Sequence, residues 1–401
     1  MTIQRVINQY FRHAWAGISR REIVFVTIAV LLILLAAMIP TGYGRTDDVS
    51  VRAKAEVLET FNQGVKNYGV LLQGEQIARI RVLDGPYHGL EAEATNLLYG
   101  KADMDKIFNP GDRALVVIHP NEDNSPAAIM IMDHWRIDIQ AGMVIGFLVL
   151  LLAFGGWTGF KSFVAFVFTG VVIWKILIPA FLAGLPPVMA SLAVVGLLSF
   201  FIIFLVAGFT RTGLAAFLGS MSGTAISAII ALALAWPYRL NGAVRPFSET
   251  LRFGGFEYLN LTQIFLAGTF LASSGAFMDL AMDVAASVDE IHQKRPGLGF
   301  VELVKSGFNV GRKVIGTMST TLLLAYTGGF TSLLMVFMAQ GVPALNTFNM
   351  VYVSSEVFHT MIGSVGLVLI APLTAILASL LAVWPWTKKR YQLLADQSAL
   401  P

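Results

Sequence analysis

The sequence predicts a polytopic α-helical membrane protein of about eight transmembrane helices, with a small all-β, barrel-like domain inserted after the first helix. Of its 401 residues, 56% are hydrophobic and only 13% are charged, about half the charged fraction of an ordinary soluble domain. Several apolar runs reach the roughly 20 residues that a helix needs to cross a bilayer. Only residues 46–136 change character, to short stretches of alternating polar and apolar side chains.

Charge and cysteine content exclude several classes of protein. The net charge is +3, and most bases flank apolar runs instead of forming a basic stripe, so the predicted partner is the lipid bilayer and not nucleic acid. The chain has no cysteine, which excludes disulfides, thiolate metal sites and cysteine nucleophiles.

Residues 1–45 are predicted to form a cytoplasmic N-terminus and the first transmembrane helix. Arginines precede the apolar run of residues 23–40. A cleaved signal peptide is the alternative, but the basic lead is long and no clean small-x-small cleavage site appears before Pro40. We therefore expect an uncleaved anchor.

Residues 46–136 are predicted to form an extracytoplasmic β-domain. Apolar and charged residues alternate in this segment, which is the period of a half-buried strand. Five strands in so short a segment predict a small barrel or sandwich, with an oligonucleotide-binding-like barrel as one option. That analogy concerns topology and implies nothing about nucleic acid. Strands are expected at residues 51–57, 78–82, 90–94, 113–119 and 127–132.

Residues 137–387 are predicted to form a seven-helix transmembrane domain, followed by a cytoplasmic tail at 388–401. Bases concentrate in alternate connections, so the positive-inside rule places both termini in the cytoplasm and the β-domain outside. Spans are expected near residues 141–156, 162–183, 188–209, 213–236, 260–283, 314–338 and 358–384.

The strongest candidate site is a pair of carboxylates in the span at 260–283. Asp279 and Asp283 are four residues apart and therefore share one helical face. An ionisable residue inside a membrane span marks a functional site by default, and its oxygens suit a divalent cation or a proton. The alternative for Asp283 is that it begins the hydrated end of the helix.

A second candidate lies at the start of the last span. Glu356 and His359 are three residues apart, the spacing by which helices of a bundle present Glu and His to a metal. An interfacial histidine is the alternative. With the predicted topology, Glu356 lies near the outer surface and Asp279 in the inner half, so we expect two ends of one path. The predicted metal ligands are Asp279, Asp283 and Glu356, and Lys175 either snorkels to the interface or pairs with Glu356.

Hydroxyl groups between these ends are predicted to line a polar path. The alternative is that they bond neighbouring helices or their own backbone, as Ser and Thr usually do in membrane helices. The run Ser273-Ser274-Gly275 also suggests an interrupted helix, as at transporter sites. Gly219 and Gly223 have the spacing of a close helix contact. The hydroxyl residues are Ser273, Ser274, Thr317 and Thr320.

Three motifs resemble one family of membrane proteins. They are Gly275-Ala-Phe-Met-Asp279-Leu-Ala-Met-Asp283-Val-Ala-Ala-Ser287, then Val310-Gly-Arg312 with Gly316-Thr317-Met318, and Glu356 ahead of Gly363-Ser364-Val365-Gly366-Leu367. Together they resemble the YibE/F-like family of bacterial multi-pass membrane proteins. The resemblance implies a location in the bacterial inner membrane and defines no biochemical role.

The sequence predicts a transporter and no enzyme. It lacks G-x-S-x-G, H-E-x-x-H and a P-loop, so transport must draw on an ion gradient, passive flow or a separate energising subunit. The leading hypothesis is a secondary transporter or permease for a small ion, either a divalent cation or a proton-coupled solute, without a cofactor. The alternative is a membrane scaffold or assembly factor whose β-domain binds a partner protein. Both hypotheses are compatible with a homo-oligomer.

Overall fold

The structure, a computed structural model, describes residues 20–43 and 50–384. The predicted cytoplasmic tail and most of the basic N-terminus lie outside these residues. The chain divides into a helical unit, made of residues 1–42 and 151–401, and a second unit, residues 43–150, that carries the strands. The secondary structure is mostly helical, with a five-stranded barrel after the first described helix.

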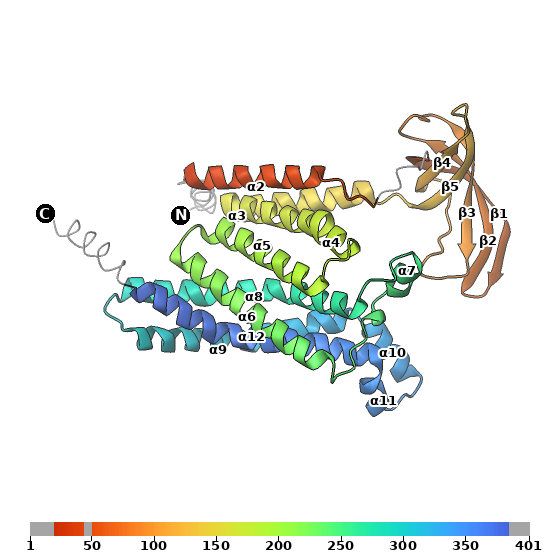
Figure 1. Cartoon of the computed structure of the whole chain (residues 1–401). Coiled ribbons are helices and arrows are strands. Elements are labelled where there is room, and N and C mark those ends of the chain that lie inside the picture. Colours follow the sequence, from red (N-terminus) through yellow and green to blue (C-terminus); the bar gives the residue numbers. More distant parts are fainter. Residues whose placement is uncertain (1–19, 44–49, 385–401) are drawn as a thin grey trace, which may run out of the picture. The chain divides into compact units, whose positions relative to one another are not determined.

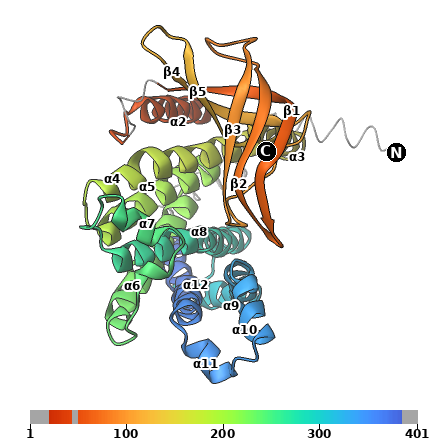
Figure 2. The same cartoon turned by 90° about the vertical axis from the view of Figure 1, so that its right-hand side faces the viewer.

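The β-domain is a closed barrel (Figure 2). Its strands are ordered β1-β2-β3-β5-β4, and all neighbours are antiparallel except β3 and β5, so the predicted small barrel is confirmed. The hairpin of β1 and β2 continues beyond the predicted strands to a turn at Gly69, where φ is +82°. The strands are β1 (Val51–Tyr68), β2 (Leu71–Val82), β3 (Glu91–Tyr99), β4 (Arg113–Pro120) and β5 (Pro126–His134).

Small side chains fill the barrel because its interior is narrow. Alternate residues of the strands point inward, and several are alanines packed around the fully buried Phe108. Gln76 is also fully buried, and a buried amide needs partners. Its Nε2 donates to the carbonyl oxygen of Phe108 at 2.9 Å, and its Oε1 accepts from the Phe108 amide at 3.0 Å. The loop before β4 is thereby held across the barrel.

Polar contacts tie the barrel to the beginning of helix α3 (Ile137–Val172). The Asp138 carboxylate accepts hydrogen bonds from Lys54 Nζ at 2.5 Å and Trp135 Nε1 at 2.9 Å. Arg113 lies 3.5 Å from the same carboxylate. The barrel unit consequently extends to residue 150, beyond the predicted boundary at 136.

Five helical stretches in the described part of the chain are long and apolar enough to cross a membrane, which indicates a membrane protein. A sixth results if α9 and α10, bent by 65° at their junction, count as one span, and residues 22–38 form a shorter apolar helix. The helices are α2 (Arg20–Met38), α3, η1 (Ile173–Leu177), α4 (Ile178–Leu182), α5 (Pro187–Ala207), α6 (Arg211–Ala235), η2 (Gly242–Val244), α7 (Ser248–Phe253), α8 (Leu261–Lys294), α9 (Phe300–Gly328), α10 (Thr331–Ala339), α11 (Ala344–Asn349) and α12 (Val351–Val383).

The longest stretch, Ile137–Leu182 with 46 residues, is interrupted at Gly156. Its backbone there is not helical, with φ +51° and ψ −126°, a conformation that favours glycine. A Cβ built on Gly159 would overlap the carbonyl oxygen of Leu151, although eight residues of straight helix span about 12 Å. The chain therefore folds back at Gly156, where the first of the two predicted spans ends.

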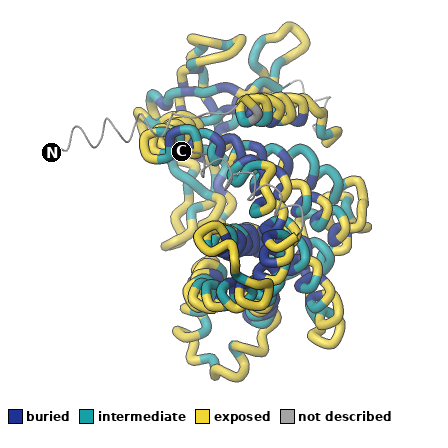
Figure 3. The backbone as a smooth tube through the Cα atoms, turned by 90° about the vertical axis from the view of Figure 1, so that its left-hand side faces the viewer, coloured by how far each residue is buried: buried dark blue, intermediate teal, exposed yellow. Residues whose placement is uncertain are grey.

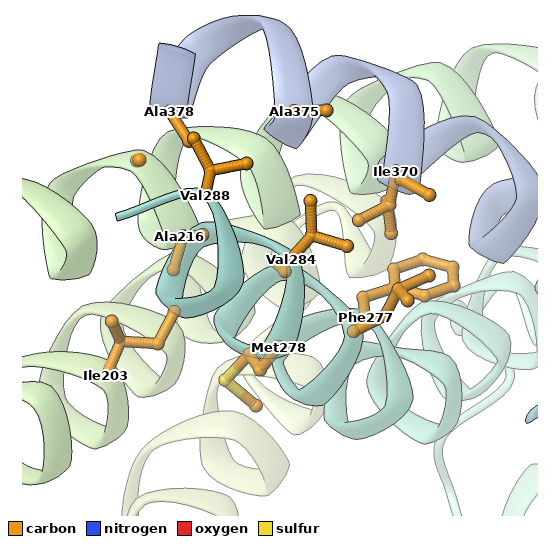
Figure 4. Packing of buried hydrophobic residues seen from close by; sticks show 14 of the residues in the cluster. Ile203, Ala216, Phe277, Met278, Val284, Val288, Ile370, Ala375 and Ala378 are labelled. Atoms are coloured by element: carbon orange, nitrogen blue, oxygen red, sulfur yellow. The ribbon is translucent and has the colours of Figure 1, made fainter. Parts of the chain in front are cut away.

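Helix α8 is the central helix of the helical unit, in contact with α5, α6, α9 and α12 (Figure 1). Its buried side packs Phe277, Val284 and Val288 against Ile370 and the alanines of α12 (Figure 4). The predicted close packing of α6 is confirmed, because a Cβ on Gly219 or Gly223 would overlap side chains of α12. Burial is greatest where these helices face one another (Figure 3).

Helices α8 and α9 differ from the prediction in length and continuity. They run to Lys294 and from Phe300, well past the predicted span limits, because their polar ends stay helical. The interruption predicted at Ser273-Ser274-Gly275 is wrong, since α8 is continuous there. Ser274 Oγ donates to the carbonyl oxygen of Leu271 at 2.7 Å, so the hydroxyl is satisfied by the helix backbone and does not break it.

Candidate functional site

One side of helix α8, which carries both predicted aspartates, is left exposed by the described residues. We call this side the carboxylate face: Gly268, Ala272, Gly275, Asp279, Asp283 and Ala286, all of them exposed. Their spacing of three and four residues keeps them on one side of the helix, away from the buried Phe277, Leu280 and Ala281. Within the described residues, neither carboxylate has a hydrogen bond or an ion pair.

The two aspartates lie at different depths from one end of the helical unit. Near that end, Thr212 at the start of α6 donates a hydrogen bond to Asp289 at 3.0 Å, and Arg211 reaches the carbonyl oxygen of Leu381 in α12. With a rise of about 1.5 Å per residue, Asp283 lies about 9 Å and Asp279 about 15 Å inward from Asp289. Asp279 is thus the farther of the two from this end of the helical unit.

The opposite end of the helical unit holds a compact set of polar side chains, the Arg245 cluster: Ser273, Arg245, Tyr326, Glu356 and His359. Arg245 follows η2, and its guanidinium donates to Glu356 Oε1 at 2.5 Å and to His359 Nδ1 at 3.0 Å. The side chains of Glu356 and His359 are only 13% and 7% exposed. A charge-assisted pair of this kind is strong because little water competes for it.

Aromatic packing completes the Arg245 cluster. The Tyr326 ring of α9 stacks on His359 with centroids 4.1 Å apart, and its hydroxyl lies 3.1 Å from Ser273 Oγ of α8. Arg245 lies over the Phe265 ring at 4.8 Å. The cluster therefore connects the loop after α6 to α8, α9 and α12.

His359 keeps one ring nitrogen without a partner. Its Nδ1 accepts from Arg245, which assigns the proton of the neutral ring to Nε2. Nε2 is buried and has no hydrogen-bond partner among the described residues. A water molecule or a small polar ligand would satisfy this donor.

The predicted metal ligands do not come together. Glu356 belongs to the Arg245 cluster, whereas Asp279 and Asp283 lie toward the other end of α8. Within the described residues, no group of three or more His, Asp or Glu side chains is arranged to hold a metal ion. Glu356 and His359 do lie on one face, 3.5 Å apart, but the Arg245 guanidinium lies where a cation would bind.

Lys175 does not pair with Glu356 in the structure. Its Nζ donates to the carbonyl oxygen of Ile39, just after α2, at 3.1 Å. The charge partner of Glu356 is Arg245, which sequence reasoning missed because a loop arginine belongs to no periodic pattern. The available signal was an acid in an apolar span together with several arginines in the connection at residues 236–259.

Most of the predicted pathway hydroxyls bond their own helix. Thr317 donates to the carbonyl oxygen of Val314 at 3.0 Å and Thr320 to that of Gly316 at 3.3 Å. Ser274 does the same within α8. Among the described residues, Ser273 is the one of the four predicted hydroxyls that hydrogen-bonds a side chain of another helix, Tyr326.

One protein family matches the part of the chain that contains the helices of the site. A family model described as YibE/F-like protein matches residues 143–384, which include the carboxylate face and the Arg245 cluster and exclude the barrel strands. No curated protein and no solved structure matches the chain.

Proposed function

The chain belongs to the YibE/F-like family, whose name assigns no activity, and we propose that it is a secondary transporter or permease for a small ion or solute, coupled to protons. The observation that carries this proposal is that Asp279 and Asp283 have no ion pair among the described residues, although α8 is long and apolar enough to cross a membrane. A charged residue at the centre of a membrane span costs about 2.5–3.5 kcal/mol on insertion scales. It persists where it is protonated, hydrated or bound.

The proposed membrane arrangement has eight spans. They are α2, the two arms that meet at Gly156, α5, α6, α8, the bent pair of α9 and α10, and α12. Arg211, Lys294 and Arg295 lie at the end of the helical unit nearest Asp289, which supports a cytoplasmic location for that end. The barrel is then extracytoplasmic, both termini are cytoplasmic, and the resemblance to bacterial proteins supports an inner-membrane location.

Protons suit this site better than a dehydrated metal ion. A proton needs one carboxylate, whereas Mg²⁺ or Ca²⁺ takes six or more oxygen ligands. Asp279 and Asp283 supply carboxylates four residues apart, and the described residues add no third acid or histidine within reach. If the substrate is a divalent cation, the proposal requires that the cation keeps most of its water shell.

The Arg245 cluster is proposed as the gate at the outer end. Its ion pair joins the connection after α6 to α12, and its stacked Tyr326 and His359 join α9 to α12. Breaking the Arg245–Glu356 ion pair would free that connection from its charged contact with α12. The sequence has no nucleotide-binding motif, so the energy would come from an ion gradient or from a separate energising subunit, unless the flow is passive. The lack of a recognisable catalytic set in the sequence supports a non-enzymatic role.

The test compares two neutral variants in liposomes that contain a pH-sensitive dye. Asp279→Asn removes a charge at nearly constant volume. Glu290→Gln is the matched control, because Glu290 is also exposed on α8 but pairs with Lys294 at 2.6 Å. An imposed pH gradient should drive proton flux through the parent and the control, and Asp279→Asn should reduce it to the level of protein-free vesicles. Equal flux through Asp279→Asn and the parent would refute the proposal, as would a parent that carries none.

One observation favours the scaffold alternative. The turn of the β1–β2 hairpin exposes Tyr68, Val70 and Leu71, with Val70 94% exposed, and an exposed apolar patch marks an interaction site. Under this alternative, Val70→Ser with Leu71→Ser should reproduce the phenotype of gene deletion, while Asp279→Asn should have no effect. The reverse result would favour transport.

A further inference from the structure

We propose that a second copy of this chain closes the carboxylate face, with helix α9 of one copy packed against α8 of the other. The contact would place Asp283 of each copy beside Arg312 of its partner. The inference uses the same face as the proposed function, but it requires only that the chain lies in a membrane and not that it transports anything.

Helix α9 has an outward face that is as unsuited to lipid as the carboxylate face. Arg312, Lys313, Gly316 and Thr320 are exposed along it, whereas Gly307 and Gly311 of the same helix are buried. Neither Arg312 nor Lys313 has a hydrogen bond or an ion pair within the described residues. Uncompensated charges inside a membrane domain face a partner or water and not lipid, so α8 and α9 each present an unmatched charge of opposite sign.

The acidic and basic groups lie at the same level of the helical unit. A Cβ built on Gly307 would lie 2.9 Å from Val288, and one on Gly311 would lie 3.8 Å from Val284. The two helices are antiparallel neighbours, so one step back along α8 corresponds to one step forward along α9. Asp283 is therefore level with Arg312, and Asp279 is level with Gly316.

A two-fold axis along the membrane normal preserves depth, as expected of a symmetric dimer. Arg312 of the second copy would consequently arrive at the level of Asp283 of the first, and the same pair would form twice. Any other orientation in the plane of the membrane keeps this match in height. Because the opposite charges lie at the same depth, we infer that the carboxylate face binds a second copy of the chain.

The carboxylate face is also shaped for a neighbouring helix. Gly307 and Gly311 of α9 each lie close to side chains of α12, where a Cβ would be crowded. Gly268 and Gly275, by contrast, have no atom within 4 Å of a built Cβ, and neither has Gly316. Small residues mark the places where membrane helices approach closely, so these three positions leave room for a helix that the described residues of one chain do not supply.

Cysteine cross-linking tests this contact directly, because the natural sequence has no cysteine. By the register above, Gly275 is level with Thr320, and both are exposed. Two differently tagged copies are co-expressed, one with Gly275→Cys and the other with Thr320→Cys, and membranes are oxidised. We expect a disulfide-linked product that carries both tags. The control replaces Gly275→Cys with Val368→Cys, an exposed position on α12, and should not cross-link.

Charge exchange tests the proposed pair. Asp283→Arg should abolish the mixed-tag product by placing like charges together, and adding Arg312→Asp in both copies should restore it. If Asp283→Arg prevents folding, the milder change Arg312→Gln takes its place, and it should weaken cross-linking. A mixed-tag product no stronger than the Val368→Cys control, a single-chain mass in nanodiscs, or a double exchange that fails to restore the product would overturn the proposal.

The two proposals fail separately. Cross-linking reports contact between copies whether or not protons flow, so a cross-linked protein without flux refutes only the transport proposal. Flux through a protein that shows neither cross-linking nor a two-copy mass refutes only the dimer.

Discussion

Replacing Gly311 with alanine adds one methyl group at a close contact between α9 and α12. The new Cβ would lie 2.8 Å from the Cβ of Ala371, and Ala371 is only 2% exposed. Ordinary carbon–carbon contacts are about 3.5–4.0 Å. The two helices must therefore separate by roughly 1 Å, or the backbone and side chains around Ala371 must be strained.

The expected cost follows from that overlap. Overpacking a well-packed interior by one methyl group costs about 1–3 kcal/mol, while alanine gains up to about 1 kcal/mol over glycine in a helix interior. Gly170→Ala in α3 is the matched control, because no atom lies within 4 Å of its built Cβ. The difference in unfolding free energy between the two variants isolates the packing cost.

A compensating exchange makes the reasoning refutable. Ala371→Gly removes the atom that the new methyl group meets, so the double variant Gly311→Ala/Ala371→Gly transfers one methyl group from α12 to α9. We expect unfolding in detergent, followed by thermal or SDS titration, to show a double variant more stable than the sum of the single changes by about 1–3 kcal/mol. If Gly311→Ala is as stable as Gly170→Ala, or if the two changes are additive, the α9–α12 contact described above is incorrect.

Two further predictions concern ion pairs. Arg245→Gln leaves the 13%-exposed Glu356 carboxylate without its cation, and we expect a loss of about 1–3 kcal/mol, less than for a fully buried pair because Arg245 is 40% exposed. Thermal unfolding should show Arg245→Gln/Glu356→Gln recovering most of this loss, and a double variant no more stable than the single one would contradict the pairing. In the barrel, the hydrogen bond from Arg81 lowers the pKa of Glu91 below its ordinary value of 4.5. The Arg81–Glu91 pair therefore stabilises the barrel above pH 4.5 and ceases to do so as the pH falls through the lowered pKa. Glu91→Gln should consequently speed hydrogen exchange of the barrel amides at about pH 7 and not at about pH 2. Equal exchange rates of the variant and the parent at neutral pH would contradict this.

Local patterns in the sequence predicted much of the architecture. The alternation in residues 51–57 and 78–82 indicated strands because a pleated strand turns successive side chains to opposite faces. Apolar run lengths indicated helices long enough for a bilayer, and the spacing of Gly219 and Gly223 indicated a close helix contact. Each of these signals lies within a few residues of the structure that it specifies.

The predicted interruption of α8 failed for an equally local reason. Serine pairs next to glycine occur where helices break, but a hydroxyl can also bond the carbonyl oxygen one turn earlier, and Ser274 does so. The two outcomes have the same sequence pattern. Packing decides between them, since α8 packs against α5, α6, α9 and α12.

The site depended on tertiary structure because its residues are far apart in the chain. Periodicity placed Asp279 and Asp283 on one side of a helix, yet only the positions of α5, α6, α9 and α12 determined that this side is uncovered. Likewise, composition showed that Glu356 in an apolar span needs a partner, but Lys175 and Arg245 were both available. The sequence by itself determined which helices and strands form and which charges require compensation. The packing of distant segments decided that Arg245 compensates Glu356 and that Asp279 and Asp283 have no ion pair among the described residues, because a side chain's partner is set by distance in space.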